Sequence, residues 1–498
     1  MSTMHATRSD TGIIASPPPS RVRMLVPSLV FACLVSAVVS SLGAPLLPAI
    51  ARLHHVDGST AQWALTATLL TGAIATPTMG RLGDGPLRRK VVLVTLALIV
   101  FGCALAALPV GFELFLAGRV LQGLGLGLTP VAIAAARDAL PADKSRSAVA
   151  LLSITTVTGV GLGYPITGLI AQLGGVHAAY WFGTAVAAVA LAVAFFVVPE
   201  ASVRESKPLD VAGAVLLAVA LCALLLGISE GETWGWGSAA VLGLLVVAVV
   251  LIAGWIVWEL RADHPLVDLR LVRHRSVLTA DIAALLAGVG MYLLLSLAVR
   301  YVQAPTSTGY GLGASAVVAG LVLVPFSAGS FVATRIAPHL AERTSHRAVL
   351  PIAAVVLLGG MLMFSFARGS MWQMLVVMGI EGIGVGLVFA VVPGMLLRAV
   401  AVSETASAMG FNQVLRYIGY SIGSAMAGMI LQIHTAPGAT DPDDGGYTAS
   451  GLLACGMWIV TLVVTLVLPE RRTTRAAVVT ERDDELMAEE SLADAEGR

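Results

Sequence analysis

The sequence predicts an all-α integral membrane protein that crosses the bilayer fourteen times. Hydrophobic residues make up 57% of its 498 residues and charged residues 12%, whereas about a quarter of the residues in soluble domains are charged. The mean hydropathy is +0.88. A spanning helix needs about 20 mostly apolar residues. Apolar runs of roughly this length fall at 25–50, 60–79, 91–110, 113–136, 147–172, 178–198, 211–229, 238–259, 277–301, 313–336, 348–367, 372–397, 405–432 and 450–469.

The basic residues predict the orientation of these spans. Because the number of spans is even, both termini lie on one side, and cytoplasmic loops hold most Lys and Arg. The loops on the side of the N-terminus contain Arg88, Arg89, Lys90, Lys144, Arg146, Arg204, Lys207, Arg261, Arg270, Arg273, Arg275, Arg343, Arg347, Arg471 and Arg472. The opposite loops contain Arg52, Arg300 and Arg368. We therefore expect cytoplasmic termini, with tails at 1–23 and 471–498, the latter disordered. The richness of the whole chain in alanine and glycine fits a bacterial source, so we expect the protein in the cell membrane.

A charged, glycine-rich turn follows the second predicted span. It includes Gly80, Asp84, Arg88 and Arg89, and its glycines permit a tight turn. The turn resembles the loop between helices 2 and 3 of the major facilitator superfamily, whose pattern is Gly-x-Leu-x-Asp-Arg-x-Gly-Arg-Lys, although Gly85 departs from it. We expect Asp84 and its basic neighbours to form a gating latch on the cytoplasmic side. The alternative is that the basic loop only sets the topology.

A weak internal repeat divides the chain. The segment that begins with Gln122, Gln-Gly-Leu-Gly-Leu-Gly-Leu, resembles the segment that begins with Glu381, Glu-Gly-Ile-Gly-Val-Gly-Leu, at an offset of 259 residues (381 − 122). Alternating glycines also serve close helix packing. Repeated halves are typical of transporters, so we expect six-helix bundles at 24–200 and 263–470.

The two remaining spans form a predicted inserted pair at 201–262. The loop after them contains His264, Pro265, Leu266, Asp268 and Leu269. This stretch is similar to one in the fourteen-helix drug:proton antiporter family of the superfamily. The resemblance implies a major facilitator fold with two six-helix bundles and a two-helix central insertion.

Ionisable groups inside the spans are candidates for proton coupling, because each costs about 2.5–3.5 kcal/mol on insertion scales. Glu381 lies about 14 Å into its span at about 1.5 Å per residue and is the first candidate. Arg416 reaches a similar depth, so a fixed Glu381–Arg416 ion pair is the alternative. Asp281 lies near the start of its span. It is a second candidate for proton coupling, and the alternative is a charge at the helix start that the helix dipole favours.

Arg119 and Gln122 form an Arg-x-x-Gln arrangement that resembles the superfamily's helix-4 motif, to which a role in proton transfer is attributed. A buried guanidinium lowers the pKa of a neighbouring carboxylate, but Arg119 is equally well explained as a structural anchor to backbone carbonyls. Gln122, Asn412, Gln413 and Tyr164 are candidates for lining a substrate cavity. Polar side chains in spans also simply join helices.

The fifth span contains a predicted bend. Gly159, Gly163, Pro165 and Gly168 resemble the glycine-proline motif of the exporter branch of the superfamily, with Tyr164 in place of a glycine. Small residues allow close helix contact and the proline removes a backbone hydrogen bond. A kinked packing seam without a role in transport direction is the alternative.

The first span departs from the pattern of the fourteen-helix family. Many of its members have an Asp there, but the stretch from Ser36 to Pro45 has none. The usual coupling mechanism therefore does not carry over, and coupling must rest on Glu381, Asp281 or another group.

These observations favour a monomeric secondary transporter that exports small lipophilic compounds against an inward flux of protons. The alternatives are a proton symporter or facilitator for uptake of a small metabolite and, with less support, a membrane scaffold without transport activity. No catalytic motif or nucleotide-binding loop occurs, so neither an enzyme nor a nucleic-acid partner is expected. The four cysteines lie inside spans without metal-ligand spacing. We expect no cofactor or metal, with the proton gradient as the energy source.

Overall fold

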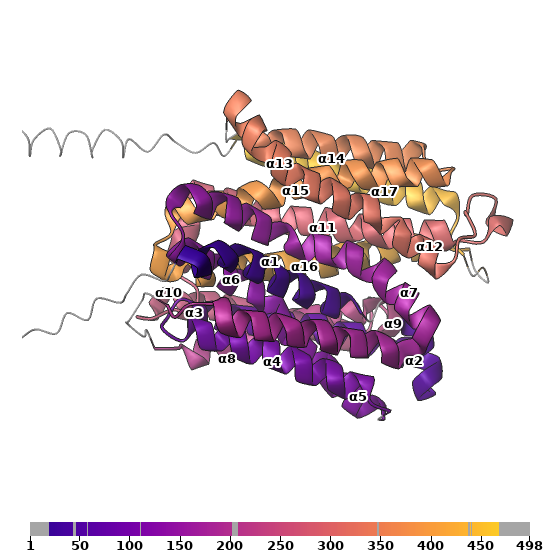
Figure 1. The fold of residues 1–498 in the computed structure, drawn as a ribbon. Coiled ribbons are helices and arrows are strands. Elements are labelled where there is room, and N and C mark those ends of the chain that lie inside the picture. The colour runs from indigo at the N-terminus through magenta and orange to yellow at the C-terminus, as the bar shows by residue number, and fades with distance from the viewer. Residues whose placement is uncertain are drawn as a thin grey trace, which may run out of the picture.

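The structure is a computed structural model, which describes residues 19–42, 46–56, 58–109, 111–201, 208–345, 348–436, 439 and 441–467. All regular elements in these ranges are helices. They run side by side as a bundle, with the N-terminal helices at one side and the C-terminal helices at the other (Figure 1).

The N-terminal helices fill the first 200 residues. They are α1 (Pro19–Ser41), α2 (Leu47–His54), α3 (Gly58–Gly83), α4 (Arg88–Ala107), α5 (Phe112–Gly123), the 3₁₀ turn η2 (Leu124–Gly127), α6 (Leu128–Ala139) and α7 (Ala142–Val197). The fourth predicted span is therefore α5, η2 and α6 together. The predicted fifth and sixth spans lie in the two helical parts of α7, which are separated by a kink at Gly175, where the backbone is not helical. Its φ of 78° and ψ of −178° belong to a region that glycine readily adopts.

The predicted inserted pair forms α8 (Val211–Ser229) and α10 (Ala239–Arg261), joined by the short α9 (Gly231–Trp234). It packs against both groups of helices. Leu217 of α8 and Trp255 of α10 share an apolar cluster with Val414 of α16, and Ile74 of α3 packs against that cluster. The pair therefore lies beside the junction of the two groups.

The C-terminal helices follow a short 3₁₀ turn, η3 (Leu269–Arg273). They are α11 (Arg275–Gln303), η4 (Thr306–Thr308), α12 (Ala316–Leu321), α13 (Leu323–Arg343), α14 (Val349–Phe366), α15 (Met371–Ala399), η5 (Val402–Glu404), α16 (Thr405–Ile433) and α17 (Asp444–Val467). Close glycine contacts join them. A Cβ on Gly382 of α15 would meet the carbonyl of Phe326 in α13, and a Cβ on Gly386 would meet Ser330 and Ala333.

Eleven helical segments in the described ranges are long and apolar enough to cross a membrane. The apolar part of α1, Met24–Ser40, is shorter than this criterion requires. One of the eleven, Pro165–Val197, runs through the bend at Gly175. The chain is thus a multi-pass membrane protein, while the count of fourteen spans stays a prediction.

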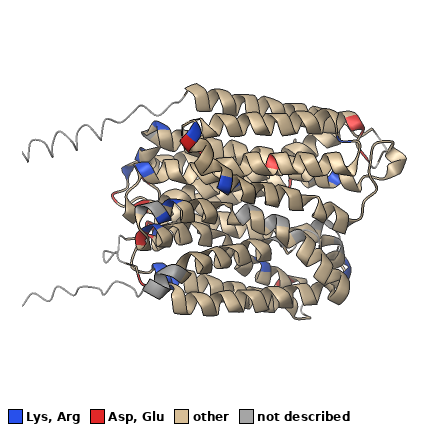
Figure 2. Cartoon of the chain, turned by 45° about the horizontal axis from the view of Figure 1, so that its top comes forward, with Lys and Arg blue, Asp and Glu red and all other residues tan. Residues whose placement is uncertain are grey.

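Charged residues gather at the two ends of the bundle (Figure 2). Among the residues that the structure describes, most Lys and Arg lie at the end where α3 ends and α4 begins, which we call the basic end. The opposite end, where α14 ends and α17 begins, is called the distal end. Few charges lie between the ends, as expected where each costs free energy to insert.

Candidate functional site

At the basic end, Asp84 joins the two groups of helices. It directly follows α3, and its Oδ1 and Oδ2 accept hydrogen bonds from the backbone N–H groups of Ala406 (2.6 Å) and Ser407 (2.9 Å). These are first-turn residues of α16, where unpaired N–H groups and the helix dipole favour a carboxylate. Gly80 allows the approach, because a Cβ there would lie 2.6 Å from the Ala406 oxygen.

Arg137, near the end of α6, makes the complementary contact with α15. Its guanidinium donates to the carbonyl oxygens of Leu397 (2.7 Å), Val400 (3.0 Å) and Ala401 (3.3 Å), and to Thr405 Oγ1 (2.7 Å). A cation at the end of a helix is favoured by the dipole, just as an anion is at its start. We call this pair of contacts the Asp84–Arg137 clamp. Arg137 was not among the sequence-predicted site residues.

The predicted basic neighbours of Asp84 have other partners. Arg88 donates to Asp138 Oδ2 at 2.7 Å and to the Gly83 oxygen at 2.7 Å. Arg89 donates to the Phe195 oxygen. These contacts stay within the N-terminal helices. Asp84 thus contacts the C-terminal helices, but the cation that bridges to them is Arg137, and the gating role of this turn stays a prediction.

Burial sets the electrostatics of Asp84, which lies outside the spans. Loss of water raises the pKa of its carboxyl to about 6 from an ordinary value of 3.8, against the opposing effect of the hydrogen bonds from Ser407 and Ala406. The free-energy cost of burying the carboxylate thus exceeds what these hydrogen bonds recover.

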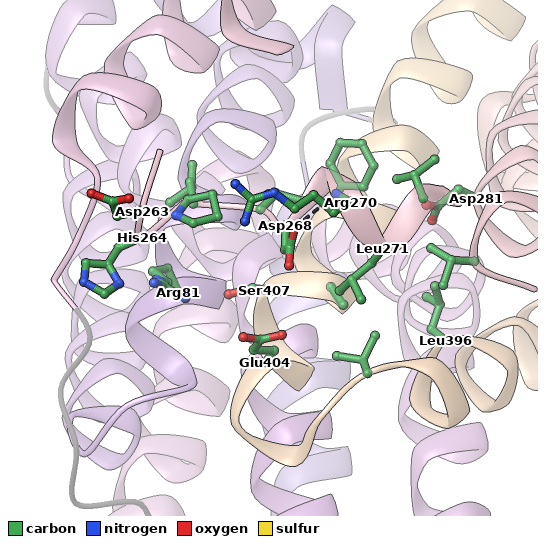
Figure 3. Close-up of a pocket in the computed structure, with 18 residues that line it drawn as sticks. Arg81, Asp263, His264, Asp268, Arg270, Leu271, Asp281, Leu396, Glu404 and Ser407 are labelled. Atoms are coloured by element: carbon green, nitrogen blue, oxygen red, sulfur yellow. Dashed lines mark hydrogen bonds between the residues drawn. The ribbon is translucent and has the colours of Figure 1, made fainter. Parts of the chain in front are cut away.

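A cavity of about 130 Å³ lies beside the clamp (Figure 3). Its wall combines the loop 263–272 with Arg81 of α3, Asp281 of α11 and the start of α16. Asp281 Oδ1 accepts a hydrogen bond from Asn412 Nδ2 at 2.8 Å. The structure thus brings together two sequence-predicted residues, Asp281 and Asn412, next to a cavity at the basic end.

Arg119 is fully buried, and all three of its side-chain nitrogens donate hydrogen bonds. It donates to the carbonyl oxygens of Ala64 (2.9 Å), Val39 (3.3 Å) and Ser40 (3.2 Å), and to Gln122 Oε1 (2.6 Å). Gln122 Nε2 in turn donates to the Gly102 oxygen at 3.1 Å. These contacts join α1, α3, α4 and α5, which favours the structural-anchor interpretation of Arg119.

Arg416 is buried against aromatic side chains. Its guanidinium lies 3.7 Å from the centre of the Phe389 ring and donates to Gln413 Oε1 (3.0 Å) and the Tyr420 hydroxyl (3.2 Å). Cation–π contact of this kind stabilises a desolvated cation. Its Nε has no hydrogen-bond partner, and neither does Gln413 Nε2.

Glu381 is fully buried in the middle of α15. Neither of its carboxylate oxygens has a hydrogen bond of acceptable geometry, although the Met361 backbone lies close by. Within the described ranges, no ion pair joins it to Arg416, so the alternative of a fixed pair finds no support in this conformation. Instead its Oε1 lies against Gly360 of α14.

One glycine of the predicted bend in α7 packs closely against α1. A Cβ on Gly159 would collide with Ala37 of α1, and Gly163 and Gly168 are buried as well. The helix continues through Pro165. The side chain of Tyr164 lies outside the described residues, so its predicted place in a cavity stays a prediction.

The chain as a whole resembles known transporters. Residues 29–306 and 280–493 match the family described as the Major Facilitator Superfamily. An uncharacterized MFS-type transporter of Mycobacterium tuberculosis (strain ATCC 25618 / H37Rv) is 30% identical over 441 residues, which cover 85% of this chain and 62% of that protein. This chain therefore spans less than two thirds of the length of that relative.

Two relatives with more specific names are similar over comparable lengths. The multidrug resistance protein Stp of M. tuberculosis is 28% identical over 77% of this chain and 71% of that protein. The tetracenomycin C resistance and export protein of Streptomyces glaucescens is 27% identical over 79% of this chain and 73% of that protein. Among solved structures, the human organic anion transporter MFSD10 matches with a TM-score of 0.64 at 16% identity, covering 90% of this chain and all of that chain. The last similarity concerns the fold alone.

Proposed function

The chain belongs to the Major Facilitator Superfamily, and from this premise we propose that it exports small lipophilic compounds in exchange for protons by alternating access. Relatives named for multidrug resistance and for export support the substrate class and the direction. The proton gradient supplies the energy. In this proposal the basic end faces the cytoplasm, in keeping with the positive-inside rule.

The observation that carries the proposal is the contrast between two related positions. Gln122 and Glu381 begin the repeated segments, 259 residues apart. Gln122 is hydrogen-bonded at both its oxygen and its nitrogen, whereas Glu381 is equally buried without a partner at either oxygen. An unpaired buried carboxylate is costly, and a neutral amide would fill the same space. Protonation removes the charge, so the site suits a carboxyl that gains and loses a proton during transport.

The clamp gives the proposed cycle its gate. Arg137 holds the end of α15, and Glu381 lies in the middle of that same helix. Asp84 holds the start of α16, which also carries Asn412, Gln413 and Arg416. A shift of α15 on protonation of Glu381 would therefore act on the clamp, and opening of the clamp would expose the polar face of α16 to the cytoplasm.

Transport by purified protein in liposomes tests this function. With an imposed pH gradient, we expect the wild type to move a lipophilic dye against the direction of proton flow. Glu381→Gln should lose this gradient-driven transport but keep dye-for-dye exchange, because exchange needs no release of a proton. Glu259→Gln is the matched control, since Glu259 is a buried carboxylate of the inserted pair.

Each other outcome has a definite meaning. Normal gradient-driven transport by Glu381→Gln would contradict the coupling role of Glu381. Movement of the dye in the same direction as the protons would show symport, and the proposed function would then be uptake and not export. The absence of transport for every lipophilic dye would contradict the proposed substrate class.

A further inference from the structure

Two neighbouring side chains of α16 carry buried hydrogen-bond donors that are left open. Arg416 is 4% exposed and Gln413 is 3% exposed, and residues three apart lie on the same face of a helix. Arg416 Nη1 donates to Gln413 Oε1 at 3.0 Å. Arg416 Nε and Gln413 Nε2 have no hydrogen-bond partner of acceptable geometry, although the Tyr417 hydroxyl lies near Gln413. Buried donors are nearly always paired in folded proteins, but the described residues provide these two donors with no acceptor.

The Arg416 guanidinium also lacks a negatively charged partner. No carboxylate of the described residues lies within ion-pair distance of it. Its contacts are with the Phe389 ring of α15, whose centre lies 3.7 Å away, and with the Tyr420 hydroxyl, which accepts a hydrogen bond at 3.2 Å. Burial of an ion without a counter-ion costs free energy. An unpaired cation inside a span is therefore a candidate for binding a ligand.

The other buried arginines that the structure describes have different surroundings. Arg88 and Arg368 each form an ion pair with an aspartate, at 2.7 and 2.6 Å. All three side-chain nitrogens of Arg119 donate hydrogen bonds. Arg81 borders the cavity at the basic end, whose wall includes several acidic side chains. Among these five, Arg416 combines burial, an open donor and the absence of a nearby carboxylate.

Aromatic rings from three helices form a cluster with this cation. Phe389 belongs to α15, and Tyr420 lies one turn after Arg416 on α16. Tyr292 of α11 stacks on Tyr420, with ring centres 4.3 Å apart and planes at 21°. Tyr417 meets the ring of Tyr420 edge-on, at 5.8 Å between centres. Aromatic faces pack well against apolar and aromatic groups, so these surroundings suit a ligand that joins a lipophilic body to an anionic group.

The open donors lie beside the junction of the two groups of helices. The Tyr417 hydroxyl donates to the Leu126 oxygen of η2 at 3.2 Å, and Gln413 lies one turn before Tyr417 on the same face of α16. Arg416 comes eleven residues after the start of α16 at Thr405 (416 − 405), which is about 16 Å at about 1.5 Å per residue. This depth is near the middle of a bilayer core about 30 Å thick. Transporters built from repeats bind their substrates at this depth, between the halves.

We infer that the exported compounds are lipophilic anions and that Arg416 and Gln413 bind their acidic group. A carboxylate, sulfonate or phenolate accepts charge-assisted hydrogen bonds from Arg416 Nε and Gln413 Nε2, while the apolar body lies against the aromatic cluster. The inference rests on the proposed function and adds the charge of the substrate to it. The first span adds no repulsion, because the stretch from Ser36 to Pro45 has no acidic residue.

Binding of a matched series of probes to the full-length protein in phosphatidylcholine nanodiscs tests the inference. Pyrenebutanoate, the uncharged pyrenebutanamide and the cationic pyrenebutylammonium share one aromatic body and differ in their end group. Fluorescence anisotropy, with empty nanodiscs as the blank, gives a dissociation constant for each probe. We expect the wild type to bind the carboxylate about ten-fold more tightly than the amide, equivalent to about 1.4 kcal/mol, and to bind the ammonium most weakly.

Variants locate the preference for the carboxylate. Arg416→Gln should abolish it, and Arg416→Lys should keep part of it because the positive charge remains. Gln413→Glu supplies Arg416 with a carboxylate of its own, so it should also abolish the preference while the arginine is still present. Arg368→Gln is the matched control, because Arg368 is a buried arginine of the C-terminal helices that pairs with an aspartate at the distal end, and it should leave the preference unchanged.

Equal binding of the carboxylate and the amide by the wild type would overturn the inference. A preference that survives in Gln413→Glu would overturn it as well, and this variant decides the question even if Arg416→Gln does not fold. Binding needs no proton gradient, so the two proposals can fail separately. A wild type that prefers the carboxylate but shows no gradient-driven transport would contradict the proposed function alone. A wild type that transports the amide and the carboxylate equally well with the gradient would contradict this inference alone.

Discussion

Replacement of Asp84 by Asn should open the basic end of the protein. The two hydrogen bonds from Ala406 and Ser407 to the carboxylate are charge-assisted, and such bonds contribute about 1.5–3 kcal/mol each. An amide keeps one acceptor oxygen and points a donor at the other N–H group. The lost hydrogen bonds destabilise the closed clamp, and removal of the buried charge offsets part of this effect. Burial opposes ionisation of Asp84 strongly enough to raise its pKa to about 6.

We expect the substitution to destabilise the closed clamp by about 1–2 kcal/mol. This changes the ratio of closed to open molecules by a factor of roughly 5–30. Distance measurements between spin labels at Leu87 and Val402 would detect it. These two residues are 41% and 43% exposed and lie on opposite sides of the clamp. We expect a longer-distance population to grow in Asp84→Asn.

The matched control is Asp210→Asn. Asp210 accepts a hydrogen bond from the Gly213 N–H at the start of α8, so it makes a similar contact within the inserted pair. It should leave the distance distribution unchanged. Equal distributions for wild type and Asp84→Asn would refute the reasoning, as would an equal shift in Asp210→Asn.

Three other properties of the protein should respond in defined ways. Closure raises the pKa of Asp84 from 3.8 to about 6. Protonation removes the charge and leaves both oxygens able to accept, unlike the Asn amide, so it favours closure fully below pH 3.8, and this contribution is lost as the pH rises through about 6. The label distances should show this pH dependence in wild type and lack it in Asp84→Asn. Gly382→Ala should lower thermal stability in detergent by about 1–3 kcal/mol, because its Cβ would overlap the Phe326 carbonyl, whereas Gly243→Ala, with open space around it, should not. Arg119→Ala should cost about 1–3 kcal/mol by leaving buried carbonyls unpaired, and an unchanged melting temperature would contradict its role as an anchor.

Sequence reasoning located the membrane-spanning class because apolar runs of bilayer length are a local property. It also placed Asp84 at a junction, since the glycines and charges of that turn are contiguous. The division of the fourth predicted span into α5, η2 and α6 was not predictable. The 3₁₀ turn at Leu124–Gly127 depends on packing by segments that are distant in the sequence.

The candidate site shows the same limit. Glu381 was found because an acidic residue inside an apolar run is visible in the sequence, but its lack of a partner depends on which side chains of α14 and α16 face it. Arg137 was missed because it lies at the edge of a predicted span, where a basic residue looks like an ordinary loop charge. Its four acceptors lie some 260 residues away, and no local pattern connects them. The pairing of Gln122 with Glu381 in the repeat was the one feature that could have directed attention to the contrast between them.

The central claim is that Glu381 exchanges protons for substrate, and proton movement driven by substrate tests it most directly. Liposomes that contain the purified protein and a trapped pH indicator would be given an outward gradient of a lipophilic dye, with no initial pH difference. We predict that dye efflux through the wild type carries protons inward and acidifies the lumen, and that Glu381→Gln abolishes this acidification while Glu259→Gln does not. Equal acidification in wild type and Glu381→Gln would contradict the account.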